Sequence, residues 1–152
     1  MSCDHKNPVV GIIMGSEATC PPWRRMKQLE NSVPYEVKVA SAHRKPLEVH
    51  EWAESAEERG IRVIIAAAGR RPILAVSSQP IRPLPVIAVP MKTSDLGGLD
   101  SCFPWCRCLQ AFRCLRCHQR RENAAILAVQ MMGTDAKALV RKSKDLKASM
   151  AQ

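Results

Sequence analysis

Residues 35–69 read YEVKVASAHRKPLEVHEWAESAEERGIRVIIAAAG and decide the fold class. Residues 35–39 alternate as a half-buried strand does, and residues 61–68 form an apolar run typical of a strand covered on both faces. Between them, residues 46–59 place apolar side chains on one helical face, start with proline and are followed by Gly60, which predicts a helix. A strand, a helix and a strand of these lengths predict a right-handed βαβ unit in a parallel sheet.

The same alternation continues on both sides of this unit. Residues 8–14 (PVVGIIM) and 84–90 (LPVIAVP) are short apolar runs that predict two more buried strands. Residues 122–132 (ENAAILAVQMM) predict an apolar helix, and residues 134–150 predict a polar, lysine-rich helix that faces solvent or a neighbouring subunit. The pattern therefore predicts the α/β class, with helices covering a parallel sheet.

The length of 152 residues suits one α/β domain over residues 1–152. The apolar runs are shorter than a membrane span, and the first residues lack the charged-then-apolar pattern of an export signal. We therefore expect a soluble, cytoplasmic protein without a membrane partner.

The basic excess is concentrated in three segments, residues 18–26, 70–76 and 102–121. The chain has 23 Lys+Arg, 14 Asp+Glu and a formal charge of +9, a balance that would ordinarily indicate nucleic acid. Without nine arginines of these segments, 14 basic residues would face 14 acidic ones. The nine are Arg24, Arg25, Arg70, Arg71, Arg107, Arg113, Arg116, Arg120 and Arg121. No helical stripe of basic residues accompanies them, so no nucleic-acid partner is expected.

The same segments hold six of the seven cysteines: Cys20, Cys102, Cys106, Cys108, Cys114 and Cys117. Residues 114–118 (CLRCH) match the attachment string of c-type haem, and the three cysteines at 102–108 suggest a zinc cluster. Haem attachment of this type would require an exported protein, which the first residues do not indicate. A zinc ribbon or finger would need a second ligand pair at suitable spacing, which the sequence lacks. We therefore expect neither motif to hold a haem or a zinc ion.

Residues with useful chemistry follow three of the predicted strands, at the edge where ligands of parallel sheets bind. Gly15 and Ser16 could offer backbone N–H groups and a hydroxyl to a phosphate, although they also suit a plain strand-to-helix turn. Residues 41–44 (SAHR) supply an imidazole for proton transfer and a guanidinium for a phosphate. On spacing alone, they equally suit a surface loop with a helix-capping serine. Gly69 follows three alanines that admit either a ligand or a packed helix.

Taken in order, these pieces resemble one family, the single-domain phosphoribosylaminoimidazole carboxylases, also called N5-carboxyaminoimidazole ribonucleotide mutases, of purine biosynthesis. The matching stretches lie in collinear order over about two thirds of the chain. They are VVGIIMGSE (9–17), PYEVKVASAHRKP (34–46), AESAEERGIRVIIAAAG (53–69), LPVIAVP (84–90), GLDS (98–101) and ENAAILAVQMM (122–132). The resemblance implies a three-layer flavodoxin-like parallel sheet with helices on both faces, a homo-octamer, a ribonucleotide substrate and no cofactor.

The resemblance also implies roles for individual residues. His43 matches the general acid/base that moves a carboxylate from the exocyclic nitrogen of an aminoimidazole ribonucleotide to its ring carbon, or adds carbon dioxide there directly. Ser16, Ser41 and Arg44 match positions that hold the 5′-phosphate. The remaining substrate-binding matches are Gly15, Thr19, Ala42 and Gly69. Thr19 stands where the family has an aspartate that accepts ribose hydroxyls, and a hydroxyl is a poorer acceptor.

The three unusual segments depart from the family pattern. GGAAHLPG is expected where residues 69–76 read GRRPILAV, and LLSxVQMPxGIPV, which should include a buried strand, is expected within 102–121. Plausible codons for these segments, read in a shifted frame, restore the family motifs, so we hypothesise local frameshifts in the coding DNA. We predict weak or no turnover for the chain as it stands. The alternatives are an inactive nucleotide-binding remnant, a basic nucleic-acid-binding module and a thiolate metal or haem protein.

Overall fold

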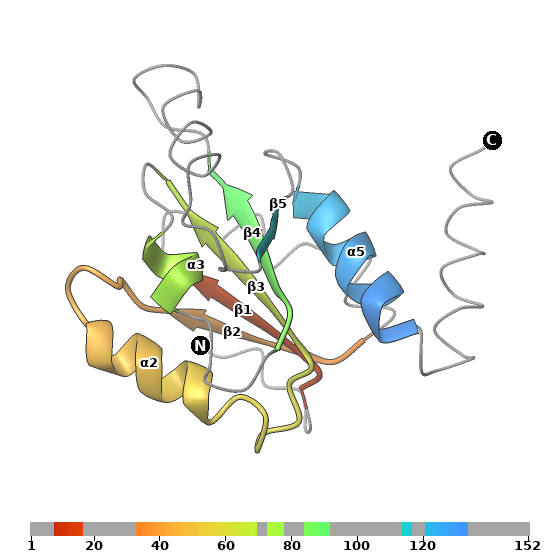
Figure 1. Cartoon of the computed structure of the whole chain (residues 1–152), viewed down its shortest axis with the longest axis horizontal. Coiled ribbons are helices and arrows are strands. Elements are labelled where there is room, and N and C mark those ends of the chain that lie inside the picture. The colour runs from red at the N-terminus through yellow and green to blue at the C-terminus, as the bar shows by residue number, and fades with distance from the viewer. Residues whose placement is uncertain are drawn as a thin grey trace.

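The computed structural model of the chain describes residues 8–16, 33–69, 73–77, 84–91, 114–116 and 121–133. Its strands form one five-stranded sheet in the order β2-β1-β3-β4-β5 (Figure 1). Every neighbouring pair is parallel. The strands are β1 (Val10–Met14), β2 (Tyr35–Val39), β3 (Val63–Ala68), β4 (Val86–Pro90) and β5 (Cys114–Arg116). This order is that of flavodoxin-like folds, so the predicted fold class is confirmed.

Helices cover both faces of the sheet. Helices α2 (Pro46–Glu54) and α3 (Ile73–Ser77) lie on one side, and α5 (Arg121–Gly133) lies on the other (Figure 1). Successive residues of β1 serve opposite faces, as the strand period of two requires. Ile12 belongs to the core cluster that includes the α5 alanines, whereas Ile13 belongs to the cluster that includes Val49 of α2 and Leu74 of α3. The result is a three-layer arrangement with two separate hydrophobic cores.

Three of the observed strands begin two residues later than predicted. The apolar runs at 8–14, 61–68 and 84–90 each continue before the hydrogen-bonded ladder starts. Ile61 shows why, because it is 1% exposed although it lies in the connection that enters β3. Burial of the entry residues makes the apolar pattern longer than the strand itself.

Helix α2 ends at Glu54 rather than at the predicted Arg59. The Ser55 hydroxyl donates to the carbonyl oxygens of Glu51 and Trp52, and the chain then continues through tighter turns. These turns close on Gly60, which has a φ of +89°. The Ile61 N–H donates to the Ala56 carbonyl and the Gly60 N–H to the Glu57 carbonyl, the bond pair of a Schellman motif. The glycine therefore stops the turns as expected, although the regular helix ends earlier.

Two short elements lie within the segments that depart from the family pattern. Helix α3 was not expected, because five residues are too few to show a helical period. Strand β5 confirms the strand expected within 102–121, and it pairs with β4 through Cys114, Leu115 and Arg116. The helix predicted for 134–150 lies outside the described residues, and the single-domain expectation stays a prediction.

Candidate active site

The carboxyl ends of β1, β2 and β3 meet at one edge of the sheet. Met14, the last residue of β1, is in register with Val39 of β2 and Ala67 of β3. The Ala40 N–H donates to the Met14 carbonyl at 2.8 Å, which extends the β1–β2 pairing past the end of β2. Because parallel strands lie about 4.8 Å apart, the segments that start at Gly15, Ser41 and Gly69 are neighbours.

This edge is also where the order of the strands reverses. The chain passes from β1 to β2 on one side of β1 and then places β3 on the other side. In open α/β sheets, ligands bind at such a reversal, outside the carboxyl ends of the strands. Gly15 follows β1 and Gly69 follows β3, so both glycines flank this position.

The loop from β2 to α2 carries the imidazole and the guanidinium. The Ser41 carbonyl accepts the N–H groups of Arg44 (3.1 Å) and Lys45 (2.8 Å), which folds the loop into a tight turn before α2. Ser41 and Ala42 are half-buried, whereas His43 and Arg44 are exposed. The loop therefore presents its two ionisable side chains at the edge of the sheet, accessible to a solute.

The structure excludes the interpretation of Ser41 as a helix-capping serine. Lys45 is the N-cap of α2, and no side-chain hydrogen bond caps the helix. Pro46 follows at the first helical position and has no N–H to satisfy. Ser41 is thus not a helix-capping serine.

The two glycines differ in what surrounds them. A Cβ built on Gly15 would meet no described residue within 4 Å, so packing among these residues does not require glycine there and leaves space beside the backbone. The alanines before Gly69 include Ala66, which is buried in the same cluster as Leu74 of α3. The helix-packing interpretation therefore holds for Ala66, while the half-buried Gly69 lies beyond it at the sheet edge.

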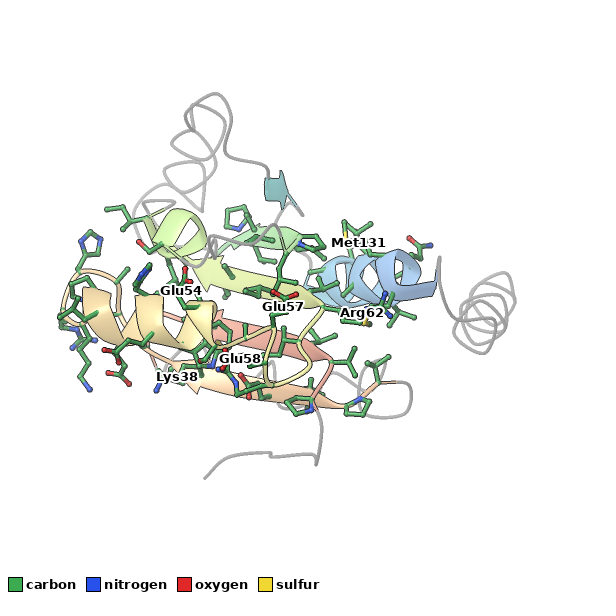
Figure 2. All side chains as sticks on the ribbon, turned by 60° about the horizontal axis from the view of Figure 1, so that its bottom comes forward. Lys38, Glu54, Glu57, Glu58, Arg62 and Met131 are labelled. Atoms are coloured by element: carbon green, nitrogen blue, oxygen red, sulfur yellow. The ribbon has the colours of Figure 1, made fainter. Side chains whose placement is uncertain are left out.

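Charged residues around this loop were not identified from the sequence. Glu48, in the first turn of α2, binds Lys38 of β2 through Oε1 (2.7 Å to Nζ) and Lys45 through Oε2 (2.9 Å to Nζ). Figure 2 shows Lys38 on the strand beside α2. Hydrogen bonds from the Lys38 and Lys45 ammonium groups lower the pKa of the Glu48 carboxyl below its ordinary value of 4.5. Only the i,i+3 spacing of Lys45 and Glu48 could have signalled this arrangement.

Other sequence predictions concern residues outside the described ranges. Thr19 is one of them, as are all the cysteines of the suggested zinc and haem motifs except Cys114. Within the described ranges, no three His, Cys, Asp or Glu side chains gather as a metal site would require. None of the helices found there combines the length and apolar character needed to span a bilayer.

Comparison with known proteins gives the family. The sequence model described as AIR carboxylase matches residues 9–152. An N5-carboxyaminoimidazole ribonucleotide mutase of Thermotoga maritima is 40% identical over 146 residues, covering 94% of this chain and 85% of the relative. A phosphoribosylaminoimidazole carboxylase of Candida glabrata is 38% identical over 143 residues, which are 92% of this chain but 25% of that longer protein.

A solved structure agrees in fold over nearly the whole chain. The crystal structure of Treponema denticola PurE superposes with a TM-score of 0.86, at 23% identity, and covers 95% of this chain and 92% of that one. The sequence matches extend through the segments that depart from the family pattern, because both the family model and the Thermotoga relative cover them. The chain belongs to the AIR carboxylase family of enzymes.

Proposed function

We propose that this chain catalyses carboxyl transfer on an aminoimidazole ribonucleotide in de novo purine biosynthesis. The substrate is either N5-carboxyaminoimidazole ribonucleotide, as in the mutases, or aminoimidazole ribonucleotide with carbon dioxide, as in the carboxylases. The product is 4-carboxy-5-aminoimidazole ribonucleotide in both cases. The observation that carries the proposal is the exposed His43, in a loop that starts beside the end of β1 and carries the family's SAHR sequence.

His43 is the proposed general acid and base. In the mutase reaction the bond between the exocyclic nitrogen and the carboxyl carbon breaks, carbon dioxide leaves, and the imidazolium donates its proton to the nitrogen. The ring carbon then attacks carbon dioxide, and the neutral imidazole removes the proton from that carbon. The imidazole thus ends in its starting protonation state. One imidazole can perform both steps because this group gains and loses protons near neutral pH.

The remaining proposed contacts hold the nucleotide. Arg44 is a charge-assisted donor to the 5′-phosphate, together with the hydroxyls of Ser16 and Ser41. Gly15 supports this role, since the open space beside it lets a phosphate approach the backbone. Ala42, Gly69 and Thr19 complete the proposed substrate-binding set.

We also propose the finer properties that the family resemblance implies. These are assembly into a homo-octamer, a cytoplasmic location and catalysis without a cofactor, as an isomerase or a lyase according to the carboxyl donor. Turnover is expected to be slow, because Thr19 replaces an aspartate and because bulky, charged residues replace the family's GGAAHL loop. An assay with enzyme in excess of substrate therefore suits this chain, with each carboxyl donor supplied in turn.

Replacing His43 by asparagine tests the proposal. His43→Asn keeps a polar side chain of similar size but cannot exchange a proton, so near-complete loss of carboxyl transfer with retained ribonucleotide binding is expected. His50→Asn is the matched control, because His50 is another exposed histidine, located on α2. Equal rates in His43→Asn and the unaltered chain would contradict the role of His43. Binding without any turnover by the unaltered chain would instead identify an inactive remnant.

The frameshift hypothesis explains the departing segments and is tested separately. Reading the coding DNA across residues 18–26, 70–76 and 102–121 decides it. An uninterrupted frame that encodes these residues would reject the hypothesis. Restoring the family sequence in one segment at a time would then show which of them limits turnover.

A further inference from the structure

One carboxylate joins both ends of the loop that carries His43. Lys38 lies in β2, just before the loop, and Lys45 is its last residue. Glu48 contacts both ammonium groups, at 2.7 Å and 2.9 Å, and uses a different oxygen for each. The chain segment between the two lysines contains Ser41, His43 and Arg44.

We propose that Glu48 is a positioning residue that holds the His43 loop in its working conformation. This inference rests on the proposed function, because it assigns a task to a residue beside the proposed catalytic group. Glu48 acts through the backbone of the loop and does not touch the reacting atoms. By fixing Lys45 to β2, it fixes the end of the turn whose N–H groups, from Arg44 and Lys45, donate to the Ser41 carbonyl.

Shared geometry, more than burial, distinguishes this arrangement from an ordinary surface ion pair. Isolated exposed pairs contribute little, since water screens them and two long side chains must be immobilised. Here the Lys38 and Glu48 side chains are 33% and 34% exposed, whereas the Lys45 side chain is 66% exposed. A single immobilised carboxylate also serves two bonds, so the second bond requires the ordering of only one further side chain, that of Lys45.

The ion pair between Arg59 and Glu36 involves the turns at the far end of α2, so it does not hold the loop as the two ion pairs of Glu48 do. His43 and Arg44 are exposed and take part in none of them. Their placement therefore depends on the backbone turn, and the turn depends on what holds Lys45.

The test compares Glu48→Gln with Glu51→Gln in the full-length chain. Both changes remove one charge from α2 and keep the side chain's shape, but Glu51 is exposed and forms none of the described ion pairs. Amide hydrogen exchange is followed at Arg44 and Lys45, with the amides of β3 as the internal reference for global opening. We expect Glu48→Gln to speed exchange at both loop amides about two- to fivefold, with a smaller change in β3 and none in Glu51→Gln.

Rate measurements give a second, independent readout. Glu48→Gln is expected to lower kcat by about two- to fivefold under conditions in which the chain stays folded. Lys38→Met should reproduce this loss, whereas Lys38→Arg, which keeps a cation opposite Glu48, should restore the rate. A simple loss of helix stability would not show this rescue by the conservative variant.

The outcomes separate this inference from the proposed function. Unchanged exchange at Arg44 and Lys45 in Glu48→Gln overturns the positioning role, whatever the activity of the chain. A chain without carboxyl transfer overturns the proposed function, and the exchange measurement still decides whether Glu48 orders the loop. Exchange that speeds up in β3 as much as in the loop also overturns the inference, because it indicates a purely global effect.

Discussion

The two ends of α2 are held in different ways. At its carboxyl end, the Arg59 guanidinium donates to Glu36 Oε1 and to the Trp52 carbonyl, each at 2.9 Å, and to the Ser55 hydroxyl. The same guanidinium lies 5.4 Å from the centre of the Trp52 ring. At its amino end, Val49 is buried in the core, and the described polar contacts are the ion pairs of Glu48 with two lysines.

The two ends of α2 have different tasks: the carboxyl end anchors the helix, and the amino end borders the candidate active site. The carboxyl end combines ring packing, a charged hydrogen-bond group and the Gly60 turn, so it fixes the helix to β1 and β2. The amino end borders the loop that carries His43. Val49 packs in the core there, while the ion pairs of Glu48 hold the side that faces the loop. Loops supported by a rigid scaffold commonly carry binding and catalytic residues, and such loops open more easily than the core. Changes at the two ends should therefore have different effects.

Trp52→Ala should have the largest effect on stability. The half-buried indole packs on Gly11 of β1, and its loss leaves a cavity between α2 and the sheet. We expect a loss of about 2–3 kcal/mol in the free energy of unfolding, measured by urea denaturation, because the ring is only partly buried. Leu47→Ala is the matched control, since Leu47 is 74% exposed on the same helix and should change stability by about 0.5 kcal/mol or less. Similar losses in both variants would contradict the packed-anchor description.

Arg59→Met should have an intermediate effect. It keeps much of the side chain's bulk but leaves the Glu36 carboxylate, which is 15% exposed, without its cation. The expected loss is about 1–2 kcal/mol in urea denaturation. The double variant with Glu36→Gln should lose less than Arg59→Met alone, because no unpaired charge remains near β2. Simple additivity of the two changes would show that the pair is not coupled.

The smallest effect is the pH dependence contributed by Glu48. Because folding lowers the pKa of this carboxyl, the stabilisation is present above its ordinary value of 4.5 and is lost as the pH falls through the lowered value. The urea midpoint of Glu48→Gln should therefore lie below that of the unaltered chain at about pH 7 and approach it at about pH 3. A difference that is the same at both pH values would exclude ionisation of Glu48 as its source.

Much of the fold could be predicted, because buried residues give the sequence a recognisable apolar pattern. Strands β1, β3 and β4 are buried on both faces, so they appear as unbroken apolar runs. The end of α2 could not be predicted, because it depends on the Ser55 hydroxyl and on i→i−3 bonds that apolar periodicity does not reveal. Helix α3 is too short to carry a period at all.

The candidate site was predictable only in part. Gly15, His43 and Gly69 share an edge because they follow parallel strands, and this could be inferred from their order along the chain. The contact of Lys38 with Glu48 could not, because it joins a strand to a helix across the loop and exists only once α2 packs on the sheet. Side chains that support a site from a neighbouring element leave little local sequence signal.

The close approach of α2 to β1 couples two positions that are far apart in the chain. A Cβ on Gly11 would lie 2.9 Å from Cη2 of Trp52 and 3.1 Å from Cδ1 of Ile61. A methyl group at position 11 is therefore accommodated only if the ring at position 52 shrinks or moves away. Mutant libraries that vary one of these codons at a time will reject combinations that the fold would accept together, so both should be randomised jointly.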